Sequence, residues 1–443
     1  MTDRTYLLLQ GPHGPFFRQL GQALRATGAR VLRVGFNRGD AVFWGRAPGY
    51  IPYGGRPEDW PAWIAALMAG QGVTDLVLYG DTRAIHAQAI RAAHARGITV
   101  HIFEEGYLRP YWATYERGGS NGHSRLMQTS VAQMRAALGG SARPLPEAPA
   151  LWGDLRHHVL YGALYHFCVL FNGQAYPHFV AHRGVSVMQE FGLYLKRLLS
   201  MPLRWARRVA ETRRVLSGGS AYHLVLLQLE HDSSFRSHSG FASQTEFIDL
   251  VLAGFAAGAP PDHHLVLKSH PLEDGRAPIA RAIREGIARH GLQGRVHFLP
   301  GGKLAALLAQ ARSAVTVNST AAQQVLWRGL PLRIFGRAVY DKPEFVSRQP
   351  LAAFFAAPRP PDPQAYRAYR AYLLETSQLP GGFYAARARR VLLARVVGMM
   401  QAVEDPYDRL RSGTAAPRPQ LPAARPASPP GTRDGLAKEN VLG

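Results

Sequence analysis

The chain has 443 residues, of which 47% are hydrophobic and 19% are charged, and this composition excludes a disordered protein. A chain of this length exceeds one ordinary hydrophobic core, so we expect two domains. The 52 Lys and Arg against 30 Asp and Glu give a formal charge of +22. This surplus favours an anionic partner, which is nucleic acid, an anionic membrane face or a phosphorylated substrate. An arginine-rich composition inherited from a GC-rich genome is the alternative explanation.

Cysteine content and hydropathy indicate the cellular compartment in which the protein is expected. Cys168 is the one cysteine of the chain, which excludes an intrachain disulfide framework and a multi-cysteine metal site. The first apolar run, Tyr6–Leu9, is too short for a signal sequence, and no window approaches the roughly 18 apolar residues of a spanning helix. We therefore expect a cytoplasmic protein.

The first 150 residues alternate strand and helix signals. The predicted strands are Tyr6–Leu9, Val31–Phe36, Asp75–Tyr79 and Thr99–Phe103. The predicted helices between them are Pro15–Thr27, Trp60–Ala69 and Ile85–Arg96. This rhythm is typical of a doubly wound parallel sheet, so residues 1–150 are predicted to form a Rossmann-like domain.

Residues 151–219 differ from what precedes them, because a long apolar and aromatic stretch is followed by repeated pairs of basic residues. The apolar stretch is Val159–Phe171, and Arg207-Arg208 and Arg213-Arg214 are two of the basic pairs. A basic amphipathic helix of this kind can lie at a lipid headgroup interface. The alternative is an ordinary bridging helix with a solvated arginine face.

A second alternating unit is predicted over residues 220–345, and a cleft is expected where the two units meet. Residues 346–411 read as helices that pack back toward the N-terminal domain, with Tyr366–Leu374 and Ala385–Met400 as the clearest pieces. Residues 412–443 are rich in Pro, Ala, Arg and Ser, and this composition predicts a disordered tail.

Three polar clusters follow the predicted strands His223–Leu227, His264–Leu267 and Ala314–Val317. The clusters run from Gln228 to Ser233, from Lys268 to Pro271 and from Asn318 to Thr320. In open α/β sheets, ligands bind at the carboxyl ends of the strands. These clusters supply a carboxylate, an imidazole, an ammonium group and hydroxyls, which suit a phosphate-bearing donor and transfer chemistry.

Each cluster has a candidate role. The carboxylate of Asp232 suits a nucleophile, a base or an electrostatic stabiliser. Lys268 and His270 lie two residues apart, so both can face a phosphate. Asn318, Ser319 and Thr320 precede a predicted helix and read as a phosphate cradle, with simple helix capping as the alternative.

The N-terminal half carries weaker signals at its strand ends. Gly11, His13 and Gly14 occupy the first βα turn, which is either a ligand loop or a tight turn held by glycine and proline. Asp81 and Arg83 follow the third strand and are expected near the cleft.

Two adjacent carboxylates, Glu104 and Glu105, follow the fourth strand, with Arg109 four positions after Glu105. Successive residues of an extended chain point to opposite sides, so one glutamate is expected to face the cleft as a general acid or base. The other is free to pair with Arg109. A purely structural ion pair is the alternative, and the sequence does not decide which glutamate faces the cleft.

Several activities are disfavoured by the residue pattern. The pairs His157-His158 and His263-His264 are adjacent, not four residues apart, so no metal site is expected. No Gly-x-Ser-x-Gly elbow of a serine hydrolase is present. The positive charge is spread along the chain without a nucleic-acid motif, so no nucleic-acid partner is expected.

Taken together, the clusters resemble the capsule polysaccharide biosynthesis and export family, in its KpsS (LipB-like) branch, over about residues 6–384. The N-terminal motifs are Leu9-Gln10-Gly11-Pro12-x-Gly14-Pro15-Phe16-Phe17, Asn37-x-Gly39-Asp40-x-x-Phe43-Trp44, Tyr79-Gly80-Asp81-x-Arg83 and Glu104-Glu105-Gly106-Tyr107-Leu108-Arg109-Pro110. The later motifs are Gln228 with Asp232-Ser233, His238-Ser239, Lys268-x-His270-Pro271, Asn318-Ser319-Thr320, Gly336-x-Ala338-x-Tyr340-Asp341, Gln378 and Gly382-Phe383-Tyr384. The chain departs from the family pattern just before Asp232 and just after Thr320.

The resemblance implies a GT-B-like pair of Rossmann-like domains and a retaining β-Kdo glycosyltransferase. It implies CMP-Kdo as the donor, without a cofactor, and a lysophosphatidylglycerol acceptor at the cytoplasmic face of an anionic inner membrane. The resemblance also makes a second capsule Kdo transferase and the ABC exporter candidate partners. By carry-over, Asp232 is the nucleophile, Glu104 or Glu105 the acid/base group, and His270 lies at the CMP phosphate. The residues assigned to the donor and its phosphate are Gln228, Lys268, Asn318, Ser319 and Thr320, together with Gly11, His13 and Gly14 of the first βα turn. A non-catalytic export or assembly factor is the competing reading.

Overall fold

The structure is a computed structural model that describes residues 4–139, 154–179, 192, 203, 205–230, 232–271, 273, 275 and 277–414. The predicted bridging segment 151–219 is therefore covered only in part. Most of the predicted tail, residues 415–443, lies outside the described residues.

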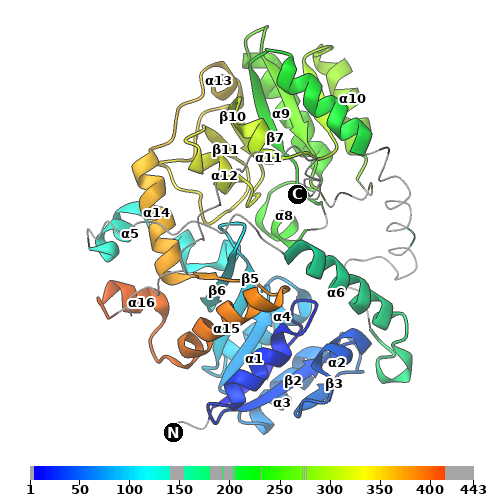
Figure 1. Ribbon diagram of the computed structural model, residues 1–443, viewed down its shortest axis with the longest axis vertical. Helices are drawn as coiled ribbons and strands as arrows, with labels where there is room; N and C mark the ends of the chain where they lie inside the picture. The colour runs from blue at the N-terminus through cyan, green and yellow to red at the C-terminus, as the bar shows by residue number, and fades with distance from the viewer. Residues whose placement is uncertain are drawn as a thin grey trace, which may run out of the picture.

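The N-terminal domain is built on a seven-stranded sheet in the order β12-β6-β5-β4-β1-β2-β3 (Figure 1). Its parallel strands are β1 (Thr5–Leu8), β2 (Arg30–Gly35), β3 (Tyr50–Pro52), β4 (Asp75–Tyr79) and β5 (Thr99–Glu105). Its helices are α1 (Phe16–Arg25), α2 (Arg38–Trp44), α3 (Trp60–Gly70) and α4 (Ala84–His94). The central strands are continuous apolar runs because helices cover both faces of the sheet.

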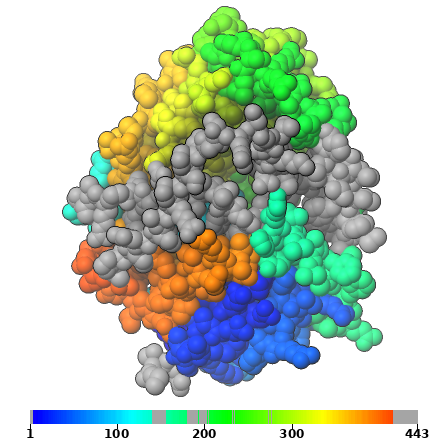
Figure 2. All heavy atoms as spheres, viewed as in Figure 1, coloured from blue at the N-terminus to red at the C-terminus, as the bar shows by residue number. Residues whose placement is uncertain are grey.

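Two antiparallel strands extend this sheet beyond β5. They are β6 (Trp112–Arg117), which pairs with β5, and β12 (Gln378–Pro380), which pairs with β6. The chain thus returns to the N-terminal domain after completing the C-terminal one. Helix α15 (Ala386–Gln401) then packs against α1, and Figure 2 shows the orange C-terminal residues directly beside the blue N-terminal ones.

The C-terminal domain contains a five-stranded parallel sheet in the order β11-β10-β7-β8-β9. Its strands are β7 (Tyr222–Leu226), β8 (His264–Lys268), β9 (Val296–Leu299), β10 (Ala311–Thr316) and β11 (Leu332–Ile334). Its helices are α8 (Ser233–His238), α9 (Gln244–Gly258), α10 (Ile279–His290), α11 (Leu304–Leu308), α12 (Ala322–Trp327) and α13 (Leu351–Ala356).

The parallel parts of both sheets share one strand order. Counted from each domain's first strand, the order is 3-2-1-4-5 in both, which is that of a Rossmann fold. The prediction of two Rossmann-like domains in a GT-B-like arrangement is confirmed. The prediction did not include α2, β3 or the antiparallel strands, because these elements are short or pair with distant parts of the chain.

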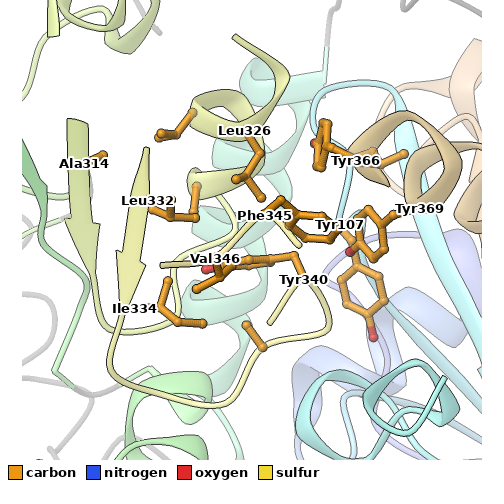
Figure 3. Close-up of a cluster of buried hydrophobic side chains, with 14 of the residues drawn as sticks. Tyr107, Ala314, Leu326, Leu332, Ile334, Tyr340, Phe345, Val346, Tyr366 and Tyr369 are labelled. Carbon is orange, nitrogen blue, oxygen red and sulfur yellow. The ribbon is translucent and has the colours of Figure 1, made fainter. Parts of the chain in front are cut away.

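One hydrophobic core joins the two domains. Tyr107 of the N-terminal domain packs in the same buried cluster as Tyr340, Phe345 and Tyr369 of the C-terminal half (Figure 3). Helices α5 (Val131–Leu138), α14 (Pro363–Thr376) and α16 (Pro406–Arg411) pack against one another beside it. Because this core crosses the domain boundary, the two domains are held face to face.

Candidate functional site

In each domain, the strand order reverses beside the first strand, and polar side chains meet there. In the N-terminal domain, the Arg83 Nη1 donates to the Gln10 Oε1 at 2.7 Å, which joins the loops after β1 and β4. In the C-terminal domain, Gln228 and Asn318 join the loops after β7 and β10. These reversal points are where open α/β sheets bind ligands.

The Gln228–Asn318 pair is buried and reciprocal. Gln228 Nε2 donates to Asn318 Oδ1 at 2.8 Å, and Gln228 Oε1 accepts from the Asn318 backbone N–H at 2.9 Å. Asn318 Nδ2 also donates to the carbonyl oxygen of His238 at 3.2 Å. The two amides therefore fix the loops that carry Asp232 and Thr320.

The two predicted glutamates lie at the end of β5, not after it, and pair with β6. Glu105 accepts a hydrogen bond from the Tyr79 hydroxyl at 3.0 Å. Glu104 lies on the other side of the strand, where its carboxylate faces Gly80: a β-carbon added there would be 3.2 Å from Glu104 Oε2. The glutamates thus face opposite sides, as alternation along the strand predicts.

Glu104 has the most altered acidity of the cleft carboxylates. Burial, together with the negative charges of Asp81, Asp232 and Glu105, raises the pKa of Glu104 to about 8, against the lowering effect of Arg83. The influence of Asp232 is informative because this residue belongs to the other domain. A carboxylic acid with this pKa is protonated at neutral pH and can donate a proton.

Asp81 lies beside Glu104 and supports a short turn at the domain interface. Its Oδ2 accepts from the Ser120 backbone N–H at 2.9 Å and contacts His123 Nδ1 at 3.1 Å. The 3-10 turn η1 (Asn121–His123) is thereby held against α8 of the C-terminal domain.

The turn η1 makes a close contact across the cleft. Arg337 Nη2 donates to the Gly122 carbonyl oxygen at 2.9 Å, and the rings of His123 and His238 meet edge to face at 5.0 Å. A pocket beside this contact is lined by residues of both domains, including Tyr107, Thr320 and Arg337. The two domains therefore meet at a small pocket where the sequence predicts the inter-domain cleft.

Gly122→Ala is expected to destabilise this interface. A β-carbon at Gly122 would lie 2.4 Å from His238 Nδ1, and the His238 ring is buried, so the two domains must shift apart. We expect a loss of about 1–3 kcal/mol of unfolding free energy. Denaturant unfolding measures it. Gly70→Ala is the control because nothing lies near its β-carbon position, and equal stability of both variants would contradict this contact.

Lys268 lies buried at the carboxyl end of β8, and its Nζ makes one long hydrogen bond of 3.4 Å to the Ser269 carbonyl oxygen. Burial, together with the positive charge of Arg208, lowers the pKa of Lys268 to about 8. A bound anion would relieve both effects, so this edge of the sheet suits a phosphate. His270 lies two residues on and is half-buried.

The hydroxyl cluster after β10 has mixed roles. Ser319 Oγ accepts from the Ala321 backbone N–H at 3.2 Å, and the Ser319 carbonyl oxygen accepts from the Tyr340 hydroxyl at 2.7 Å. Ser319 therefore shapes the turn before α12. Thr320 lines the inter-domain pocket.

The first βα turn lies under another helix, α6 (Asp154–Val169). A β-carbon on Gly11 would clash with the Phe17 ring, and one on Gly14 would lie 2.9 Å from the Tyr161 ring. His13 stacks on Tyr165 at 4.3 Å. Of the three predicted residues, His13 and Gly14 thus seat α6 on the N-terminal domain, and Gly11 makes room for Phe17 of α1.

Arg109 is exposed, and its Nε donates to the Gly106 carbonyl oxygen at 3.2 Å. Within the described part of the chain, no ion pair joins Arg109 to Glu104 or Glu105. In the same part of the chain, no group of three His, Cys, Asp or Glu side chains is arranged to hold a metal ion.

Sequence reasoning placed none of His123, Arg208 and Arg337 at the candidate site. His123 lies in a short turn without an apolar run before it, so no strand-end signal marks it. Arg208 lies near enough for its charge to lower the pKa of Lys268, and it belongs to the bridging segment, where the sequence indicated a lipid-facing or solvated basic face. The motif containing Arg337 was noted in the resemblance, and that was the one signal available.

Comparisons with known proteins give a consistent picture. The family model described as capsule polysaccharide biosynthesis protein matches residues 74–384. The chain is 29% identical to the capsule polysaccharide export protein KpsS of Escherichia coli, over 87% of this chain and 98% of that protein. It is 31% identical to the capsule polysaccharide modification protein LipB of Neisseria meningitidis serogroup B, over 86% of this chain and 91% of that protein.

Solved structures resemble it more distantly. The β-Kdo 2,7 transferase of Thermosulfurimonas dismutans KpsC aligns at a TM-score of 0.42 and 13% identity, over 90% of this chain and 100% of that chain. Anabaena Alr3699/HepE in complex with UDP-glucose aligns at a TM-score of 0.32 and 11% identity, over 93% of this chain and 98% of that chain.

Proposed function

We propose that this chain, which belongs to the capsule polysaccharide biosynthesis protein family, is a retaining glycosyltransferase. Its proposed reaction moves β-Kdo from CMP-Kdo to a lysophosphatidylglycerol acceptor, as the sequence motifs imply. No cofactor takes part in the proposed reaction.

The observation that carries the proposal is the pairing of two carboxylates from different domains. The pKa of Glu104 is about 8, so this carboxyl group holds its proton at neutral pH. Asp232 lies near enough for its negative charge to raise that pKa. Asp232 is exposed at the start of α8, so it is open to a substrate in the cleft. A carboxylic acid that holds its proton at neutral pH, together with a second carboxyl group open to the substrate, is the apparatus of retaining glycosyl transfer.

The proposed reaction has two steps. In the first, an Asp232 carboxylate oxygen attacks C2 of Kdo while the bond from C2 to the phosphate oxygen breaks. Glu104 gives its proton to the departing CMP. In the second step, the acceptor hydroxyl oxygen attacks C2, the bond to Asp232 breaks, and Glu104 takes the acceptor proton. Two displacements retain the configuration at C2 and restore both carboxyl groups.

The donor phosphate is assigned to Lys268 and His270, with Thr320 and Asn318 on the neighbouring loop. Lys268 is buried beside Arg208, and a phosphate there gains a charge-assisted hydrogen bond. Ser319 supports the loop from its backbone side. Asp81, Arg83 and Arg109 belong to the domain proposed to receive the acceptor.

Lys268→Met is expected to weaken CMP binding about tenfold to a hundredfold, because one charge-assisted hydrogen bond is lost. The free lysine has a pKa of about 8, so wild-type affinity should fall as pH rises through 8, whereas the affinity of the variant should not. Titration calorimetry measures both. The exposed Lys303→Met is the control, and unchanged CMP affinity in Lys268→Met would refute the assignment.

The site of action is proposed to be the cytoplasmic face of the inner membrane, where the lipid acceptor and an anionic surface meet. The charge of +22 supports this placement. None of the helices in the described residues is long and apolar enough to cross a membrane. A second capsule Kdo transferase and the ABC exporter are proposed as further partners, and nucleic acid is not.

A second candidate function is a non-catalytic export or assembly factor, which the name of the Escherichia coli relative favours. Incubation with CMP-Kdo, generated in situ, and a fluorescent lysophosphatidylglycerol analogue separates the two functions. The transferase predicts a mass gain of one Kdo on the acceptor. Absence of transfer by a folded protein that also fails to bind CMP would favour the assembly factor.

A further inference from the structure

We propose that the outer face of α6 docks this protein on an anionic bilayer by inserting its apolar side chains among the lipid headgroups. The inference rests on the proposed function for its partner, which is a membrane carrying the acceptor. Vesicle binding is measured without donor or transfer, so the two claims can fail separately.

The outer face of α6 and the turn after it expose a continuous apolar stripe. Val159 is 62% exposed and Phe167 is 59% exposed, and the stripe as a whole consists of Val159, Leu160, Leu164, Phe167, Leu170 and Phe171. Helical spacing of 3.6 residues per turn places the first four on one side of α6, and Leu170 and Phe171 follow in the turn after it. Figure 2 shows this part of the chain on the surface of the molecule, beside the N-terminal domain.

The opposite face of α6 is anchored by specific contacts. Tyr165 is buried, and its hydroxyl accepts hydrogen bonds from Gln10 Nε2 at 2.8 Å and Asn37 Nδ2 at 2.6 Å. The ring of His158 stacks on Tyr384 at 4.2 Å. The helix is thus apolar on both faces, and the protein buries only one of them. An exposed apolar patch of this size marks an interaction surface.

The charges around the stripe decide in favour of an anionic bilayer. No acidic residue occurs between Leu155 and Phe179. Arg156 and His157 are exposed at one end of the stripe, and at the other the exposed Arg38 donates from Nη1 to the Phe171 carbonyl oxygen at 3.1 Å. Apolar side chains bordered by basic residues, in a segment without acidic residues, are typical of interfacial helices on anionic lipid.

The anchoring contacts also connect this face to the cleft. Gln10 receives a hydrogen bond from Arg83 and gives one to Tyr165, so a single chain of contacts runs from α6 to the residue that lowers the pKa of Glu104. A bilayer at α6 therefore lies beside the acceptor-side domain.

The test is sedimentation of the full chain with vesicles of phosphatidylcholine alone or with phosphatidylglycerol. Wild type is expected to bind the phosphatidylglycerol vesicles. The double variant that carries Leu160→Asp and Phe167→Asp is expected to have a partition coefficient at least about tenfold lower. The control is Val403→Asp, because Val403 is 91% exposed but isolated from the stripe, and it should bind as wild type does.

A second measurement tests the same proposal even if the double variant folds poorly. Leu160→Cys in a Cys168→Ser background, labelled with a polarity-sensitive fluorophore, should shift its emission to the blue on phosphatidylglycerol vesicles. Absence of vesicle binding by wild type, unaltered binding by the double variant, or an unshifted label would each overturn the proposal. So would a dimer that the double variant dissociates while vesicle binding stays unchanged, since the face would then bind a second copy.

Discussion

Asp232→Ala is expected to lower the rate of sugar transfer about 10³-fold or more while leaving the fold and CMP binding intact. Removal of a covalent nucleophile leaves only the binding and electrostatic contributions to catalysis. The side chain is exposed, so its removal should change the unfolding free energy by no more than about 1 kcal/mol. Transfer is followed by mass spectrometry, CMP binding by calorimetry and folding by thermal unfolding.

The matched control for this change is Asp262→Ala. Asp262 is also exposed, but it precedes β8 at the end of the sheet opposite the cleft. It should transfer Kdo at the wild-type rate. An Asp232→Ala variant that transfers as fast as Asp262→Ala would remove Asp232 from the mechanism.

Glu104→Gln is expected to have the second largest effect, with a loss of transfer of about 10²–10⁴-fold, because the amide cannot exchange a proton. In the wild type, the first step needs the protonated acid, whose pKa is about 8. Activity at low donor concentration should therefore fall as pH rises above 8. A pH profile of kcat/KM measures this, and a profile flat to pH 9.5 would contradict the role of Glu104.

The same substitution should stabilise the protein in alkaline solution. The folded state holds the Glu104 proton up to about pH 8, whereas the unfolded chain releases it near 4.5. The contribution of Glu104 to the unfolding free energy of the wild type should thus decline as pH rises from 4.5 to 8. The Glu104→Gln variant should therefore exceed the wild type in unfolding free energy by about 1–3 kcal/mol at pH 8.5, but not at pH 4.5. Glu105→Gln is the control, because its carboxylate accepts from Tyr79 and should show no such gain.

Strand-end chemistry was the part of this site that the sequence could predict. Polar residues after apolar runs located Gln228, Lys268 and Asn318, because parallel strands bring their carboxyl ends to one edge of a sheet. Period-two alternation also predicted that the two glutamates face opposite sides. These inferences need only local periodicity and the geometry of a parallel sheet.

Other features depend on contacts between distant parts of the chain. Alternation could not decide between Glu104 and Glu105, because the choice depends on Asp232 and Asp81 from other segments. The strand β12 has three residues and gains its partner only when the chain returns to β6. The short turn of His123 is fixed by Asp81 and has no pattern of its own.

The sequence also left the role of the apolar stretch of the bridging segment open. Its run of apolar residues indicates a helix, but not which face is covered. The contacts of Tyr161 with Gly14 and of Tyr165 with Gly39 show which face of α6 is covered, because each glycine leaves room for a ring. Sequence periodicity could not show this, since α6 is apolar on both sides.

The most direct test of the two-step mechanism is to look for the covalent intermediate. The wild-type protein is mixed with CMP-Kdo without acceptor, quenched rapidly and digested, and the peptides are analysed by mass spectrometry. The mechanism predicts one Kdo on the peptide containing Asp232, and none in the Asp232→Ala variant. A Kdo ester on another residue, or transfer with inverted configuration at C2, would contradict it.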